Sequence, residues 1–96
     1  MKSKYIPEPI EIESVKLSES LLELVEKLSK HNHDLWASQR FKENWKFGKE
    51  RNDNRKSHPC LIPYEYLPDC EKEYDRISVI GTLKAIIKLG YSITEI

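Results

Sequence analysis

One amphipathic segment of the chain spans residues 20–43 and reads SLLELVEKLSKHNHDLWASQRFKE. Its apolar side chains recur at the spacing of a single helix face. Ser20 and Glu23 have the spacing of a capping box, and Ser18 offers an alternative cap. We therefore predict a helix from Ser18 or Ser20 to about Glu43 that packs along its length. Its expected inner face consists of Leu21, Val25, Leu28, Asn32, Leu35 and Gln39, with Leu24 and Trp36 at the margins.

A second helix is predicted to begin near Pro68, because proline suits the first turn of a helix. Lys88 in the last turn and Gly90 beyond it form a stop signal, and Tyr91 is expected to fold back on the helix. Residues 91–93 are expected to run extended beside the middle of the chain. The late half of this helix presents one apolar face and the early half another, namely Val79, Ile80, Leu83, Ile86 and Ile87, then Cys70, Tyr74 and Ile77.

The segment between the two helices, residues 44–68, lacks a helical period but is rich in proline and aromatic side chains. It is too aromatic for a disordered linker, so we expect an ordered, irregular connection with short strands near residues 45–47 and 61–62. Asn32 and Gln39 are expected to hold this connection through hydrogen bonds to its backbone.

The chain ahead of the first helix, residues 1–17, contains Pro7 and Pro9 and is predicted to form an extended arm along the domain surface. A length of 96 residues indicates a single domain, residues 1–96, with one core. The predicted fold is predominantly α, of the α+β type. In it, two packed helices clasp an ordered irregular connection with short β-strands.

Sixteen basic and sixteen acidic residues cancel, which argues against a nucleic-acid or membrane partner. The charges are nevertheless unevenly placed. Six Glu and one Lys fall between Glu8 and Glu26, whereas six cations and three acids fall between Lys42 and His58. The chain lacks an apolar run of membrane-spanning length, and its N-terminus lacks the apolar stretch of a secretory signal. The two cysteines are expected to be reduced thiols in a cytoplasmic protein.

Metal binding and catalysis find little support in the sequence. His31 and His33 are two residues apart, so on a helix they point in different directions and cannot share a metal ion. His58 and Cys60 flank Pro59, without the glycine-rich turn that presents a nucleophile. We therefore expect no catalytic residue, no metal site and no cofactor, and a protein that is not an enzyme.

An aromatic and cationic cluster lies on the flank of the first predicted helix. His33, Trp36 and Arg40 line one side of that helix, and Trp45 follows in the connection. A planar base could stack on the indole rings while phosphate meets Arg and Lys. Alternatively, the tryptophans attach the connection to the helix, with Arg40 stacked on one of them. The expected ligand-binding residues are Trp36, Arg40, Trp45, Arg51, Lys56 and His58.

An ordered series of short motifs runs along nearly the whole chain. They are YIPEP at 5–9, NHDLWA at 32–37 with Arg40, WKFG at 45–48, RND at 51–53, HPCLIPY at 58–64, EKEYDR at 71–76, and LK at 83–84 with LGY at 89–91. Together they resemble the repeat domain of ryanodine receptors, the RyR domain. No single motif is diagnostic, but the set in this order and spacing is specific.

The resemblance implies an RyR-repeat-like fold and a binding role. In the receptors this repeat occurs as tandem pairs in the cytoplasmic shell, where it serves contacts, regulation and, in one pair, the binding of a nucleotide-type ligand. A lone copy looks like the free-standing single repeats of bacteria and phages. Any site that the family builds between paired repeats would need a dimer or another partner here. Asn44 also replaces the glycine typical before the signature tryptophan, and asparagine tolerates the same left-handed backbone.

The leading hypothesis is a binding module for a phosphate-bearing small molecule such as a nucleotide. Trp36 and Trp45 would stack on the base, and His58 would orient the loop or the ligand. The phosphate would be held by Arg40, Arg51 and Lys56. The alternative is a protein–protein or homo-oligomer assembly domain that uses the tryptophan face, since Trp and Arg are also typical interface anchors. Single-stranded nucleic acid on the basic connection is a third possibility, which the zero net charge opposes.

Overall fold

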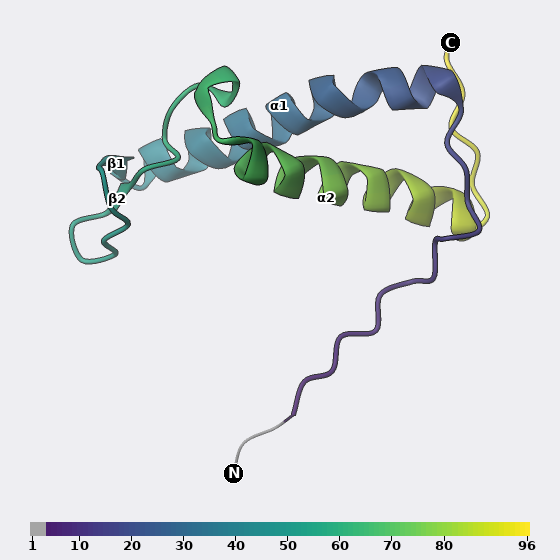
Figure 1. Cartoon of the computed structure of the whole chain (residues 1–96), viewed down its shortest axis with the longest axis horizontal. Coiled ribbons are helices and arrows are strands. Elements are labelled where there is room, and N and C mark those ends of the chain that lie inside the picture. Colours follow the sequence, from purple (N-terminus) through teal and green to yellow (C-terminus); the bar gives the residue numbers. More distant parts are fainter. Residues whose placement is uncertain (1–3) are drawn as a thin grey trace.

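The computed structural model describes residues 4–96, which form two long helices joined by an irregular connection (Figure 1). In chain order the elements are α1 (Glu19–Lys42), β1 (Lys46–Phe47), β2 (Ser57–His58), the short 3-10 helix η1 (Tyr64–Tyr66) and α2 (Asp69–Lys88). The long helices run side by side in opposite directions. The predicted fold, predominantly α with short β-strands, is confirmed. Within the described residues, neither long helix has an apolar stretch that would cross a membrane.

Local chemistry sets the ends of both long helices. Ser18 caps α1, because its hydroxyl accepts a hydrogen bond from a backbone N–H of the first turn at 3.3 Å. Just beyond α1, Asn44 has a φ of 70°, the left-handed conformation that asparagine tolerates. α2 follows Pro68, and the chain leaves it through Gly90, whose φ is 103°. Both predicted helices are therefore confirmed, with Ser18 rather than Ser20 as the cap.

The inner face of α1 is rotated relative to the predicted one. Asn32, Leu35 and Gln39 were expected inside but are exposed. Hydrophobic periodicity identifies only apolar positions, whereas two of the inner positions of α1 are occupied by Ser29 and His33. The buried residues of α1 are Leu21, Val25, Ser29 and His33, at a regular spacing of four.

The main core lies between the two helices, near the start of α1 and the end of α2. Its buried centre is formed by Val25, Val79 and Leu83. Partly buried apolar side chains pack around this centre, namely Leu17, Leu28, Ile80 and Ile93. The apolar face predicted for the late half of α2 thus contributes to the core, whereas Tyr74 and Ile77 of its early half are exposed.

The connection contains a minimal sheet and its own buried side chains. β1 and β2 pair in parallel, with Lys46 opposite Ser57 and Phe47 opposite His58. Gly48 lies close to this pair, since a Cβ atom there would come within 2.7 Å of the Cβ of Ser57. The buried side chains of the connection are Trp45, Ser57, Leu61, Tyr64 and Leu67.

The strand predicted at residues 61–62 is wrong, because the second strand is Ser57–His58. Pro59 and Pro63 flank the expected strand, and proline has no N–H to contribute to a sheet. Leu61 is nevertheless buried, so its apolar side chain indicates a buried position in an irregular segment and not a strand.

The N-terminal arm does not lie along the domain surface over residues 4–10, which project away from the helices (Figure 1). Tyr5 and Ile6 are 83% and 75% exposed. The two prolines of this stretch keep it extended but remove backbone N–H groups that could bond to the domain. Contact with the helices begins at Glu11, whose carboxylate pairs with Lys88 at 3.2 Å.

Residues 91–93 lie near the start of α1, where Ile93 packs against the core, and not beside the connection as predicted. Tyr91, which was expected to fold back on α2, is exposed. The antiparallel arrangement of the two helices explains where residues 91–93 lie. Because α2 ends where α1 begins, the chain that leaves Gly90 meets the first turns of α1.

Leu83→Ala is expected to lower the free energy of unfolding by about 2–4 kcal/mol, because it opens a cavity in the centre of the core. Leu89→Ala is the matched control at an exposed position just past α2, with an expected change below about 0.5 kcal/mol. Urea unfolding followed by circular dichroism measures both. Equal losses for the two variants would contradict the placement of the core.

Candidate functional site

The second half of α1 carries an aromatic and cationic cluster that binds the connection to the helix. The guanidinium carbon of Arg40 lies 4.7 Å from the ring centroid of Trp45 and 5.9 Å from that of Trp36. The rings of Trp36 and His58 meet edge-to-face, with centroids 5.0 Å apart. Trp45 is only 9% exposed. Arg40 therefore stacks on Trp45 and lies at the edge of cation–π range from Trp36, and Trp45 serves mainly to attach the connection to α1.

The buried polar anchor of the connection is His33. Its Nε2 atom lies 2.7 Å from the backbone oxygen of Ile62, and because a carbonyl can only accept, Nε2 carries the proton. The side chain is 5% exposed. Asn32 and Gln39 were expected to fill this role, but both face solvent. The anchor is thus the one polar residue on the inner face of α1 that is long enough to reach the connection.

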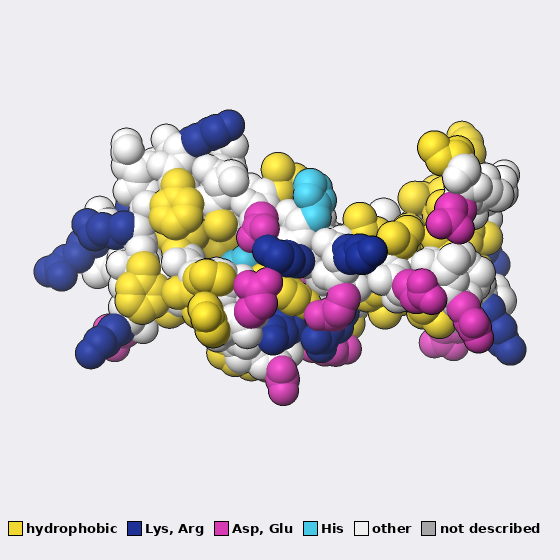
Figure 2. Space-filling model, turned by 90° about the horizontal axis from the view of Figure 1, so that it is seen from above, with side chains coloured by type: hydrophobic (Ala, Val, Ile, Leu, Met, Phe, Trp, Pro, Cys, Tyr) yellow, Lys and Arg dark blue, Asp and Glu magenta, His cyan; other side chains and the backbone are white. Residues whose placement is uncertain are grey.

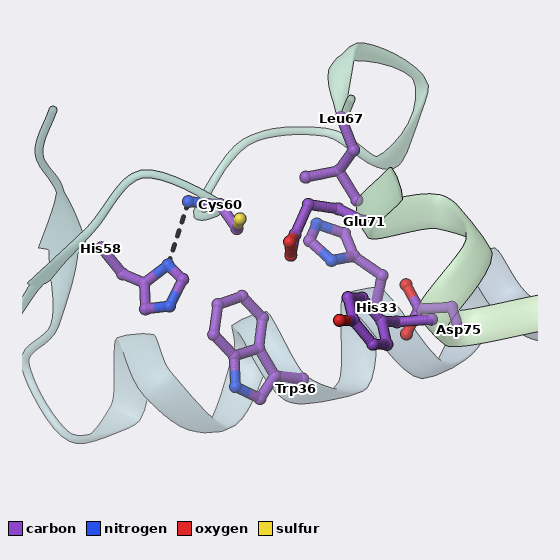
Figure 3. Close-up of a pocket in the computed structure, with 8 residues that line it drawn as sticks. His33, Trp36, His58, Cys60, Leu67, Glu71 and Asp75 are labelled. Atoms are coloured by element: carbon purple, nitrogen blue, oxygen red, sulfur yellow. Dashed lines mark hydrogen bonds between the residues drawn. The ribbon is translucent and has the colours of Figure 1, made fainter. Parts of the chain in front are cut away.

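A half-open cavity of about 260 Å³ lies where α1, the connection and the start of α2 meet (Figure 3). Trp36 and His58 line it at the side of α1 and the connection. Glu71 and Asp75, from the first turns of α2, line it opposite His58. Cys60 and Tyr74 also contribute to the wall. The cavity therefore combines an aromatic wall with two carboxylates.

His58 is held in a neutral form. Burial lowers the pKa of its imidazole, and the nearby guanidinium groups of Arg51 and Arg40 lower it further. Its Nδ1 atom accepts a hydrogen bond from the backbone N–H of Cys60 at 3.0 Å. The neutral ring must therefore carry its proton on Nε2, which leaves one donor for a ligand.

Burial also raises the pKa of two other groups in the cavity wall. The pKa of the Asp75 carboxyl is raised first by burial, with a smaller contribution from Glu71, while His33 acts in the opposite direction. The pKa of the Cys60 thiol is raised by burial and by Glu71. Cys60 therefore remains a protonated thiol, which is a poor nucleophile. Within residues 4–96, no group of three or more His, Cys, Asp or Glu is arranged to hold a metal ion.

Two of the expected basic residues, Arg51 and Lys56, bond to neighbouring groups. Arg51 is close enough to influence His58, and its side chain pairs with Asp53 at 3.0 Å. The ammonium group of Lys56 donates to the backbone oxygen of Glu43 at 3.0 Å and so fastens the end of α1. Neither cation lines the cavity.

Of the six predicted site residues, the structure thus places Trp36 and His58 in the cavity wall. Arg40 and Trp45 lie against them, Arg51 lies near His58, and Lys56 is engaged at the end of α1. The sequence interpretation missed the contribution of α2. Two carboxylates from the first turns of this helix reach the cavity, namely Glu71 and Asp75.

The pKa of His58 is expected to lie below 6.5, the value for an unperturbed imidazole. Because the folded state binds this proton more weakly than the unfolded chain, the free energy of unfolding should fall as the pH drops from 6.5 through the folded-state pKa. NMR titration of the histidine ring protons measures the midpoint. Arg51→Gln should raise it by removing a nearby positive charge, whereas the more distant Lys16→Gln should leave it unchanged. An unchanged midpoint in Arg51→Gln would contradict the placement of Arg51 near His58.

The comparison with known families agrees with the motifs in the sequence. The model of the RyR domain matches residues 5–95, which is nearly the whole chain. The matched region includes both helices, the connection and every residue that lines the cavity. The chain belongs to the RyR domain family.

Proposed function

We propose that this RyR domain is a non-enzymatic binding module for a phosphate-bearing small molecule such as a nucleotide, and that the cavity beside Trp36 receives its base. The observation that carries the proposal is the composition of this single cavity. Its wall combines aromatic rings with two carboxylates, and two guanidinium groups lie near His58 in that wall, each paired with an exposed carboxylate of its own. A nucleotide has the complementary parts, because its base is planar and bears amino donors while its phosphate is anionic.

The two ends of the cavity favour one orientation of such a ligand. Glu71 and Asp75 can accept hydrogen bonds from amino groups on the edge of a base, but they would repel phosphate. The phosphate would instead lie toward Arg51 and Arg40, the guanidinium groups near His58. Stacking falls to Trp36, because Trp45 is buried against Arg40. The carboxylates thus select the base, and the guanidinium groups hold the phosphate.

Binding is a better account of this site than catalysis. Cys60 is a thiol rather than a thiolate, because burial raises its pKa. Nδ1 of His58 is occupied by a backbone hydrogen bond, which removes the atom that would act as a base. The burial of Trp45 also weighs against the alternative function, assembly through the tryptophan face, because it leaves little exposed indole surface there.

Trp36→Leu is expected to abolish a stabilisation that nucleotides confer on the unmodified chain. At a hundred times the dissociation constant, a ligand adds about 2.7 kcal/mol to the free energy of unfolding. Thermal denaturation and tryptophan fluorescence with ATP, AMP, adenosine and inorganic phosphate measure the effect. Phe41→Leu, which alters an exposed aromatic side chain of α1, is the matched control and should bind as before.

Two further variants test separately the residues proposed to bind the base and those proposed to bind the phosphate. Asp75→Asn should weaken adenosine and AMP alike, whereas Arg51→Gln should weaken AMP and leave adenosine unchanged. If no nucleotide, nucleoside or phosphate shifts the unfolding transition of the unmodified chain, the proposed function is wrong.

A further inference from the structure

The two carboxylates in the wall of the cavity beside Trp36, those of Glu71 and Asp75, have no basic partner. Other carboxylates, such as those of Asp34 and Glu73, pair with Lys or Arg, and acidic and basic side chains are interspersed on the face shown in Figure 2. Within residues 4–96, neither Glu71 nor Asp75 forms an ion pair. Their oxygen atoms therefore remain available as acceptors for a ligand in the cavity.

The carboxylate of Glu71 extends from α2 toward Cys60, as Figure 3 shows. It contributes, after burial, to the raised pKa of the Cys60 thiol. A thiol is only a weak donor, so this contact leaves most of the acceptor capacity of Glu71 unused. Asp75 lies close enough to Glu71 for the two negative charges to interact. No Lys or Arg among residues 4–96 lines the cavity, so its wall favours a ligand that offers several donors.

We propose that the nucleotide bound in this cavity carries guanine, an inference that rests on the proposed function, and that Glu71 binds the edge of this base. An ionised carboxylate only accepts hydrogen bonds, and its two oxygen atoms match two adjacent donors that lie in one plane. Guanine has such a pair, because its ring N1–H stands next to the amino group at C2. The second hydrogen of that amino group is left for Asp75.

The other common bases place an acceptor beside the donor on the corresponding edge. Adenine and cytosine each present an amino group next to an unprotonated ring nitrogen, and uracil presents one N–H between two carbonyl groups. Each of these acceptors would face a carboxylate oxygen, which repels it and leaves both atoms unsatisfied. The adenine amino group can still donate to one carboxylate, so adenine is expected to bind, but more weakly than guanine.

The shape of a purine agrees with the charges near the cavity. The sugar is attached at N9, on the opposite side of the double ring from N1 and C2. A guanine that stacks on Trp36 and turns this edge toward Glu71 therefore directs its sugar and phosphate away from the carboxylates. The guanidinium groups of Arg51 and Arg40, near His58, are then left to bind the phosphate.

The monophosphates of guanosine, inosine, adenosine and xanthosine (GMP, IMP, AMP and XMP) test the inference, because they share sugar and phosphate and differ only in the base. The unmodified chain should bind GMP at least about tenfold more tightly than IMP or AMP, since IMP lacks the amino group at C2 and AMP lacks N1–H. Isothermal titration calorimetry measures the four dissociation constants.

Glu71→Gln replaces one acceptor oxygen by an amide donor at nearly constant size. The amide suits the N1–H and the neighbouring carbonyl of xanthine, and no longer suits the two donors of guanine. This variant should bind GMP at least about tenfold more weakly than the unmodified chain does, and XMP more tightly. Glu73→Gln is the matched control, because it changes an exposed carboxylate of α2 that pairs with Arg76 outside the cavity. It should keep the preference for GMP.

A reversed preference between GMP and XMP cannot arise from a general loss of fold or affinity, and circular dichroism checks that both variants are folded. If the unmodified chain binds AMP or IMP as tightly as GMP, or if Glu71→Gln keeps the preference for GMP, the inference of guanine is wrong while the proposed function stands. If none of the four nucleotides binds, both are wrong.

Discussion

One buried hydrogen bond, from Nε2 of His33 to the backbone oxygen of Ile62, determines where the connection lies on α1. The connection cannot hold its own shape, since residues 43–68, all of which the structure describes, contain only two strands of two residues and one short 3-10 helix. In the interior such a bond is strong, and breaking it would leave a buried carbonyl unsatisfied. η1 and Leu67 of the cavity wall follow directly after this attachment point in the chain.

Three residues at successive turns of α1 lie on one side of the helix and have different roles. His33 anchors the connection, Trp36 supplies the aromatic wall of the cavity, and Arg40 stacks on the buried Trp45. These positions share one side of a helix because they are three and four residues apart. A small domain with one core thus builds a site from packing contacts that it needs in any case. Trp45 thus attaches the connection to α1, while Trp36 lines the cavity.

The net charge is zero, but acidic and basic residues are unevenly distributed, both near the cavity and along the chain. At the cavity, Glu71 and Asp75 of α2 line the wall with Trp36 and His58, and the guanidinium groups of Arg40 and Arg51 lie near His58. Along the chain, six Glu and one Lys fall between Glu8 and Glu26, whereas three cations of the connection line a hollow around β1, namely Lys46, Lys49 and Arg55. Charges placed in this way act locally and produce no strong overall field, because they are screened beyond about 10 Å.

The sequence by itself determined both helices, their ends, the apolar face of α2 and the family, because caps, stop signals and motif spacing act over a few neighbouring residues. Only the tertiary structure decided which face of α1 turns inward, because Ser29 and His33 are polar and their burial depends on the partner that covers them. The cavity likewise forms only because α2 packs against α1. In the sequence, Glu71 and Asp75 only belong to an acidic helix start, and packing places them in one cavity wall with Trp36, because contacts so distant in sequence leave no local pattern to read.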